Sequence, residues 1–216
     1  MNFQDTQLIG VLARAESTVS SLSDLLGGLV EKFAARGYSL YLVGGSVRDA
    51  LLGRLGNDLD FTTPARPDVV KEILDEWAET VWDTGIDFGT VSAAYKGQQI
   101  EITTFRSDSY DGQSRNPEVV YGDTLEGDLV RRDFKVNAMA IELLADASFT
   151  FHDPLHGLQD VADRVLDTPD KPEISFHDDP LRMLRAARFA SQLEFRVADR
   201  VVDAMRDMVG ENQAIT

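Results

Sequence analysis

The sequence predicts an α/β fold in which a small mixed β-sheet is flanked by helices and followed by an all-helical neck. Two observations lead to this prediction. Short β-rich runs alternate with apolar residues at helical spacing through residues 38–155, a pattern typical of a sheet covered by helices. Helical spacing then dominates the remainder of the chain. We therefore expect an N-terminal helical leader at 1–37, a head at 38–155 and a neck at 156–216.

Periodicity and turn residues place the individual elements. Apolar spacing predicts a helix that follows a short leader and closes at Gly37, a second helix within 64–78 and a last one within 194–209. Two β-rich runs, 90–95 and 99–105, are joined by Lys-Gly, which indicates a hairpin.

The stretch at 42–63, LVGGSVRDALLGRLGNDLDFTT, is the centre of the head. It indicates a strand, a tight turn at Gly44 and Gly45, a helix, and a second strand that carries two aspartates. Ser46 can cap this helix, whose free N–H groups would suit an anion. Gly53 stands where a left-handed C-terminal cap is expected.

Three carboxylates follow on predicted strands. Asp58 and Asp60 point to one side of a strand while Leu59 points to the core, because alternate residues share a face. Hard oxygen ligands at this spacing suit magnesium, and two such ions about 4 Å apart suit phosphoryl chemistry. Taken alone, the two aspartates are more simply explained by a solvated strand edge. Glu101, between two isoleucines, is either an exposed acid or the third member of a carboxylate triad.

Arginines gather in two later segments. Asp123 or Thr124 can cap a short helix that leads to Arg131 and Arg132, with a strand returning at 138–144. Farther along, Asp178 or Asp179 can cap a helix that has Pro180 in its first turn. Three arginines recur on that helix at every third position, where solvent-facing charge would be the ordinary explanation. They are Arg182, Arg185 and Arg188.

The order of these motifs resembles the bacterial and eukaryotic tRNA nucleotidyltransferases and the related bacterial poly(A) polymerases. Both belong to the polymerase-β-like nucleotidyltransferase superfamily. Lys135 stands where the family often has threonine, and Asp178 stands where it has glutamate. The segment DPLHG at 153–157 resembles the family's hinge between head and neck, but a plain β-turn would explain it equally well. In chain order, the segments are GGSVRD with LLGR and D-x-D, EITTFR, RRDFKVNAMA, DPLHG and DDPLRMLRAARF.

The resemblance implies nucleotidyl transfer without a nucleic-acid template. The 3′-hydroxyl of a tRNA would attack the α-phosphate of CTP or ATP, releasing pyrophosphate and building the CCA end. A carboxylate that accepts from the exocyclic amine of cytosine or adenine would be repelled by the carbonyl of uracil or guanine. The implied catalytic residues, which also bind two Mg²⁺ ions, are Asp58, Asp60 and Glu101. Gly45 and Arg48 would cradle the triphosphate, Arg132 would bind the triphosphate or the sugar, and Asp133 and Asn137 would shape the sugar pocket. Asp179 and Arg182 would read the base, and Arg185 and Arg188 would supply further positive charge.

Several alternatives stay open at this level. Addition of CC alone, addition of A alone and poly(A) tailing share these motifs. By the resemblance, such enzymes differ in a flexible loop and in C-terminal parts, and the polar loop at 107–117 is the candidate for that loop here. A non-catalytic nucleotide-binding module is the alternative from another class. The chain has 216 residues and a net charge of −16, so either it does not bind RNA, or its basic surface is local or lies outside this segment. We expect weak binding of tRNA and an N-terminal fragment of a longer enzyme.

Composition limits where the protein acts. The absence of cysteine excludes disulfides and thiolate metal sites and is consistent with the cytoplasm. The N-terminus lacks the layout of a signal peptide, and no apolar run is long enough to cross a membrane. His152 and His156 lack neighbouring metal ligands in the sequence and are interpreted as ordinary loop residues.

Overall fold

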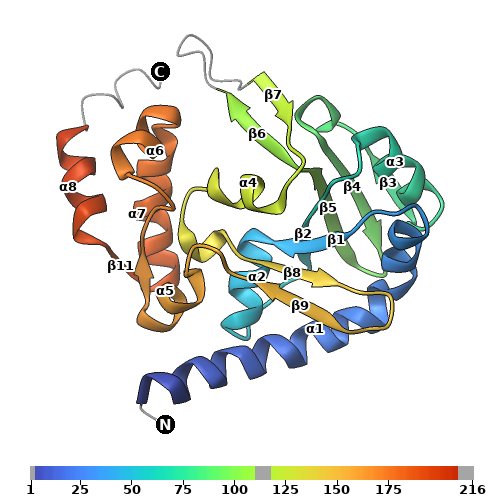
Figure 1. Ribbon diagram of the computed structural model, residues 1–216, viewed down its shortest axis with the longest axis horizontal. Coiled ribbons are helices and arrows are strands. Elements are labelled where there is room, and N and C mark those ends of the chain that lie inside the picture. Colours follow the sequence, from blue (N-terminus) through green and yellow to red (C-terminus); the bar gives the residue numbers. More distant parts are fainter. Residues whose placement is uncertain (1–2, 110–117, 209–216) are drawn as a thin grey trace.

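A mixed β-sheet forms the centre of the protein. The computed structural model describes residues 3–109 and 118–208 (Figure 1). Within them, seven strands pair in the order β3-β4-β5-β2-β1-β8-β9, and helices flank the sheet. The predicted fold class is thereby confirmed. Only β2 and β5 pair in parallel among these strands. The strands are β1 (Leu40–Val43), β2 (Asp58–Thr63), β3 (Thr80–Trp82), β4 (Thr90–Tyr95), β5 (Gln98–Thr104), β8 (Ala140–Leu143) and β9 (Phe149–His152).

The N-terminal helix is longer than the sequence predicted. Helix α1 (Phe3–Ala35) begins almost at the N-terminus, so the expected leader is itself helical. Val11, Ala15 and Val19 extend its buried stripe at intervals of four residues, which keeps the helix amphipathic upstream of the leucines. The predicted end is confirmed, since Gly37 has a φ of +78°. No helix in the described ranges is long and apolar enough to cross a membrane.

The two faces of the sheet have different partners. Leu40 and Leu42 of β1 join the main core with α1, whereas Val43 joins a second cluster with Leu129 of α4 (Leu125–Val130). Successive residues of a strand point to opposite faces, so Leu40 and Leu42 share one face and Val43 lies on the other. Helix α3 (Pro67–Asp75), within the range predicted for the second helix, packs into the main core through side chains such as Ile73.

The predicted hairpin is confirmed, whereas the predicted polar loop is shorter at its start. Lys96 and Gly97 both have positive φ, at 47° and 78°, as a tight two-residue turn between β4 and β5 requires. The polar loop predicted at 107–117 begins later than expected. Its first residues belong to β6 (Arg106–Ser109), which pairs antiparallel with β7 (Glu118–Tyr121). The part of the predicted loop at 110–117 lies outside the described residues.

The C-terminal part is helical except for one strand pair. Helices α5 (Gly157–Asp163), α6 (Pro172–Asp178), α7 (Leu181–Leu193) and α8 (Asp199–Asp207) form it. The expectation of an all-helical neck needs correction because β10 (Val165–Leu166) pairs in parallel with β11 (Arg196–Val197). The last helix accordingly begins later than 194, and α6 precedes the predicted helix start. The two predicted domain boundaries, after residues 37 and 155, stay predictions.

The start of α5 is tied closely to the head. Both carboxylate oxygens of Asp153 accept backbone hydrogen bonds, from Gly157 at 2.7 Å and Leu158 at 3.0 Å. A Cβ on Gly157 would lie 2.2 Å from the carbonyl oxygen of Lys135. Only glycine allows this approach of two backbones. The contact fixes α5 against η2 (Lys135–Asn137), the short 3₁₀ helix before β8.

Candidate functional site

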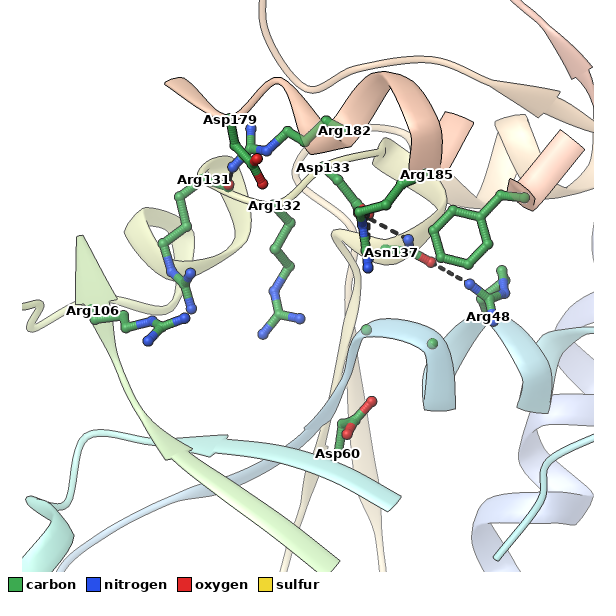
Figure 2. A pocket seen from close by; sticks show the side chains of 13 residues that line it. Arg48, Asp60, Arg106, Arg131, Arg132, Asp133, Asn137, Asp179, Arg182 and Arg185 are labelled. Atoms are coloured by element: carbon green, nitrogen blue, oxygen red, sulfur yellow. Dashed lines mark hydrogen bonds and ion pairs between the residues drawn. The ribbon is translucent and has the colours of Figure 1, made fainter. Parts of the chain in front are cut away.

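A polar pocket of about 420 Å³ lies between the head and α7. Figure 2 shows Asp60 on one side, Asp179 and Arg182 on the opposite side, and Arg132 pointing into the space between them. Nine of the predicted site residues line it. The lining consists of Gly44, Gly45, Arg48, Asp60, Arg106, Arg131, Arg132, Asp133, Asn137, Asp179, Arg182, Arg185 and Phe189.

The glycine turn brings the backbone close to the pocket's arginines. Gly44 has a φ of +66°, and a Cβ on it would lie 3.0 Å from Nη1 of Arg132. Helix α2 (Gly44–Leu51) starts directly at this turn, with the extended Val43 as its N-cap residue. The predicted turn is confirmed, and Gly53 after the helix also has a positive φ, of 71°.

Ser46 does not cap α2, contrary to the sequence prediction. With Ser46 as its cap the helix would begin at Val47, but it begins three residues earlier, at Gly44, and has no side-chain cap. Instead, the Ser46 hydroxyl accepts from the backbone N–H of Asp60 at 2.9 Å and donates to the carbonyl oxygen of Asp58 at 3.4 Å. Ser46 therefore ties the glycine turn to the strand of the two aspartates.

The three predicted metal-binding carboxylates lie on one face of two neighbouring strands. Asp60 of β2 is opposite Glu101 of β5 in the parallel register. Leu59 between the aspartates is 1% exposed, so Asp58 and Asp60 point away from the core. The donors are hard oxygen atoms, which fit Mg²⁺. Within the described ranges, however, no three His, Cys, Asp or Glu side chains are already close enough together to hold a metal ion.

Like charges perturb Asp60. Burial and the negative charge of Glu101 raise the pKa of the Asp60 carboxyl, and Asp58 adds to the effect. The positive charge of Arg132 opposes the rise in pKa. A cation beside this face would relieve the repulsion. Asp60 lines the pocket, whereas Asp58 and Glu101 are absent from its lining.

A buried network connects α2, η2 and α7. Arg48 donates to Oδ1 of Asn137 at 2.6 Å and to the carboxylate of Asp49 at 2.9 and 3.0 Å. Asn137 donates in turn to Asp133 at 2.9 Å, and Arg185 donates from Nε to the second oxygen of Asp133 at 2.8 Å. The four predicted residues of this network are therefore brought together, and their orientation is fixed before any ligand binds.

A single buried carboxylate holds two of the pocket's arginines. Asp128, with a side chain 0% exposed, accepts from Arg131 at 3.1 Å and from Arg132 at 2.8 Å. Although burial favours the neutral acid, the charges and hydrogen bonds of Arg132 and Arg131 hold the pKa of Asp128 below its ordinary value. Asp128 thus remains ionised and anchors both guanidinium groups.

The predicted base-reading pair lies at the start of α7. Asp179 accepts from the backbone N–H of Leu181 at 2.9 Å, in partial agreement with the predicted cap, while Asp178 ends α6 instead. Arg182 donates to the hydroxyl of Ser175 at 2.8 Å and to the carbonyl oxygen of Arg131 at 2.7 Å.

The sequence did not predict three of the side chains that line the pocket, and one arginine that it did predict is absent from the lining. Arg106 ends the EITTFR segment and Arg131 begins the RRDFKVNAMA segment, so their place within these segments was the available signal. Phe189 contacts Arg185 and Arg48, with guanidinium carbons 5.1 and 5.3 Å from its ring centre. Arg188 is absent from the lining and lies over the same ring at 4.9 Å.

The pocket is locally basic in an acidic chain. Six arginines line it against three aspartates, whereas the whole chain has a net charge of −16. Of the two interpretations that composition left open, the arrangement favours a local basic surface. Such a surface attracts phosphate groups.

Comparison with known proteins adds the family. Residues 40–167 match the family described as the poly A polymerase head domain. The CCA-adding enzymes of Lactobacillus helveticus and Listeria monocytogenes serovar 1/2a are 42% and 39% identical to the chain over 172 and 183 residues. These matches cover 79% and 84% of this chain but 41% and 44% of the enzymes. The chain therefore spans less than half the length of these curated relatives.

Solved structures give the same result. The CCA-adding enzyme of Bacillus stearothermophilus in complex with CTP superposes with a TM-score of 0.71 at 36% identity, covering 85% of this chain and 42% of that one. A tRNA nucleotidyltransferase complexed with a primer tRNA and an incoming ATP analog has a TM-score of 0.70 at 30% identity, with coverage of 90% and 50%. Because the matched region exceeds half of the sequence, this chain belongs to the poly A polymerase head domain family.

Proposed function

We propose that this chain is the nucleotidyltransferase part of an enzyme that adds CCA to the 3′ end of tRNA. CTP and ATP would be the nucleotide substrates, and pyrophosphate would leave. The observation that carries the proposal is the arrangement of the pocket. Asp60 lies on one side, Asp179 and Arg182 on the other, and Arg132 between them. The relatives at about 40% identity, described as CCA-adding enzymes, support this assignment.

The pocket suits a nucleoside triphosphate in one orientation. Its phosphates would lie against Arg132 and the glycine turn at Gly45, next to Asp60. Its base would then reach Asp179 and Arg182, which offer an acceptor and donors for a base edge. The bound CTP and ATP analog in the two related structures support nucleotides of this class.

Asp58, Asp60 and Glu101 would hold two Mg²⁺ ions on their shared face. When bound, such ions lower the pKa of an attacking hydroxyl and stabilise the leaving oxygens. The raised pKa of Asp60, caused by burial and by Glu101, supports a cation at this place. Side-chain rotation would be needed to converge the three groups.

The remaining predicted residues have distinct proposed tasks. Arg48 donates to Asp49 and Asn137, so we propose that it fixes the sugar pocket rather than carrying the phosphate alone. Asp133 and Asn137 would contact the sugar. Arg185 forms an ion pair with Asp133 and would contribute positive charge near the sugar. Arg188 would act only at a distance, because it lies outside the lining.

Incorporation of labelled nucleotide into a tRNA that lacks its CCA end tests the proposal. The chain with Mg²⁺ should transfer nucleotide from both CTP and ATP, and Asp60→Asn should abolish transfer without unfolding the protein. Use of ATP alone would favour A-addition or poly(A) tailing. Nucleotide binding without any transfer would favour the non-catalytic binding module. Because the chain carries a net charge of −16, we expect it to bind tRNA weakly.

A further inference from the structure

Arg182 is held at both ends of its guanidinium group. Nη1 donates to the hydroxyl of Ser175, and Nη2 donates to the backbone carbonyl of Arg131. A guanidinium is planar and has five N–H donors in fixed directions. Two anchored nitrogens therefore fix the plane and leave the remaining donors for a ligand in the pocket.

Ser175 contacts both members of the proposed base-reading pair. Its hydroxyl binds the side chain of Arg182, and its carbonyl oxygen accepts from the backbone N–H of Asp179 at 3.2 Å. Ser175 is 5% exposed and does not line the nucleotide pocket. It can therefore act on a nucleotide only through Asp179 and Arg182.

A second cavity explains why Arg182 needs the hydrogen bond to Ser175. About 420 Å³ of space lies between α4 and α6, lined by Ser175, Arg131 and Arg182 together with Val130 and Ile174. This space adjoins the nucleotide pocket because Arg182 lines both. Without an acceptor on α6, the long side chain of Arg182 has room to swing away from the base.

We infer that Ser175 is a positioning residue that sets nucleotide selectivity by orienting Arg182. The inference rests on the proposed function, in which Arg182 reads the base. A hydrogen bond from a charged donor is typically worth at least as much as a tenfold change in an equilibrium constant. We expect Ser175→Ala to lower the preference for CTP and ATP over UTP and GTP by about tenfold.

The test measures kcat/KM for the four nucleotides with Ser175→Ala and Ser175→Thr in the full chain. Threonine keeps the hydroxyl and should restore most of the selectivity. The matched control is Ser20→Ala, since Ser20 is also a helical serine but is exposed on α1. The control should leave the selectivity ratio unchanged. If the extra methyl group of Ser175→Thr lowers Tm, the ratio measured for Ser175→Ala decides alone.

Arg182→Ala separates the two ways of failing. If Arg182→Ala retains selectivity, Arg182 does not read the base, and that part of the proposed function fails together with the inference. If Arg182→Ala loses selectivity while Ser175→Ala keeps it, the inference alone is overturned. An equal loss of kcat/KM for all four nucleotides in Ser175→Ala would show a merely structural role and would also overturn the inference.

Discussion

Replacing Asp128 by asparagine should destabilise the protein strongly. The side chain of Asp128 is completely buried and accepts three hydrogen bonds from Arg131 and Arg132, at 2.8 to 3.3 Å. Removing one partner of a buried ion pair costs about 3–5 kcal/mol because the other charge stays uncompensated. An amide keeps one acceptor, so we expect the lower end, about 3 kcal/mol of unfolding free energy.

Urea denaturation measures this loss against a control with the same spacing. Asp203 pairs with Arg206 at 3.2 Å, three residues along a helix, but both side chains are mostly exposed. Asp203→Asn should change the unfolding free energy by less than about 1 kcal/mol, as for other surface pairs. Equal effects of the two substitutions, or a loss of unfolding free energy below about 1 kcal/mol for Asp128→Asn, would show that the buried ion pairs of Asp128 do not stabilise the protein more than a surface pair does.

The Asp128 contribution should also depend on pH in a defined direction. Because Arg132 and Arg131 outweigh burial and lower the folded-state pKa of Asp128, its stabilising effect is complete above the ordinary range of carboxyl groups. The effect disappears as pH falls through the lower folded-state pKa. The stability difference between the wild type and Asp128→Asn should therefore shrink below about pH 4.

Two further substitutions test the packing and the charge around α5. Gly157→Ala should lower the unfolding free energy by about 2 kcal/mol or more, because its Cβ would lie 2.2 Å from the Lys135 carbonyl oxygen. Gly27→Ala, in the interior of α1 with nothing within 4 Å, should raise it instead; equal losses would contradict the packing argument. Burial and nearby carboxylates raise the pKa of Asp160 to about 6, so its ionised form destabilises the fold as pH rises. Asp160→Asn should raise Tm at pH 7 but not at pH 4, and a pH-independent gain would exclude this cause.

Local chemistry was sufficient to predict much of the head. Lys96-Gly97 between two β-rich runs indicated the hairpin because glycine readily takes the positive φ that the second position of such a turn requires. Alternation alone placed Asp58 and Asp60 on one face. The register that sets Asp60 opposite Glu101 depends on how distant strands pair, so the sequence could only suggest it through a family resemblance.

Other features depend on tertiary contacts that leave no local signal. Serine is common at helix N-caps, but here the Ser46 hydroxyl accepts a hydrogen bond from the backbone N–H of Asp60 on the neighbouring strand instead. Arg188 follows the same three-residue spacing as Arg182 and Arg185, yet it is absent from the pocket lining because successive steps of three move around the helix. Helix rotation relative to the pocket cannot be read from spacing alone.

A thermal-shift titration tests directly whether Asp179 and Arg182 select the base of the nucleotide. The protein with Mg²⁺ is heated with CTP, ATP, UTP or GTP, and Asp179→Ala is measured alongside. A ligand that binds only the folded state at 100 times its Kd stabilises it by about 2.7 kcal/mol. We expect a rise in Tm with CTP and ATP alone and loss of that preference in Asp179→Ala. Equal shifts with all four nucleotides would contradict the assignment of Asp179 and Arg182 as the residues that select the base.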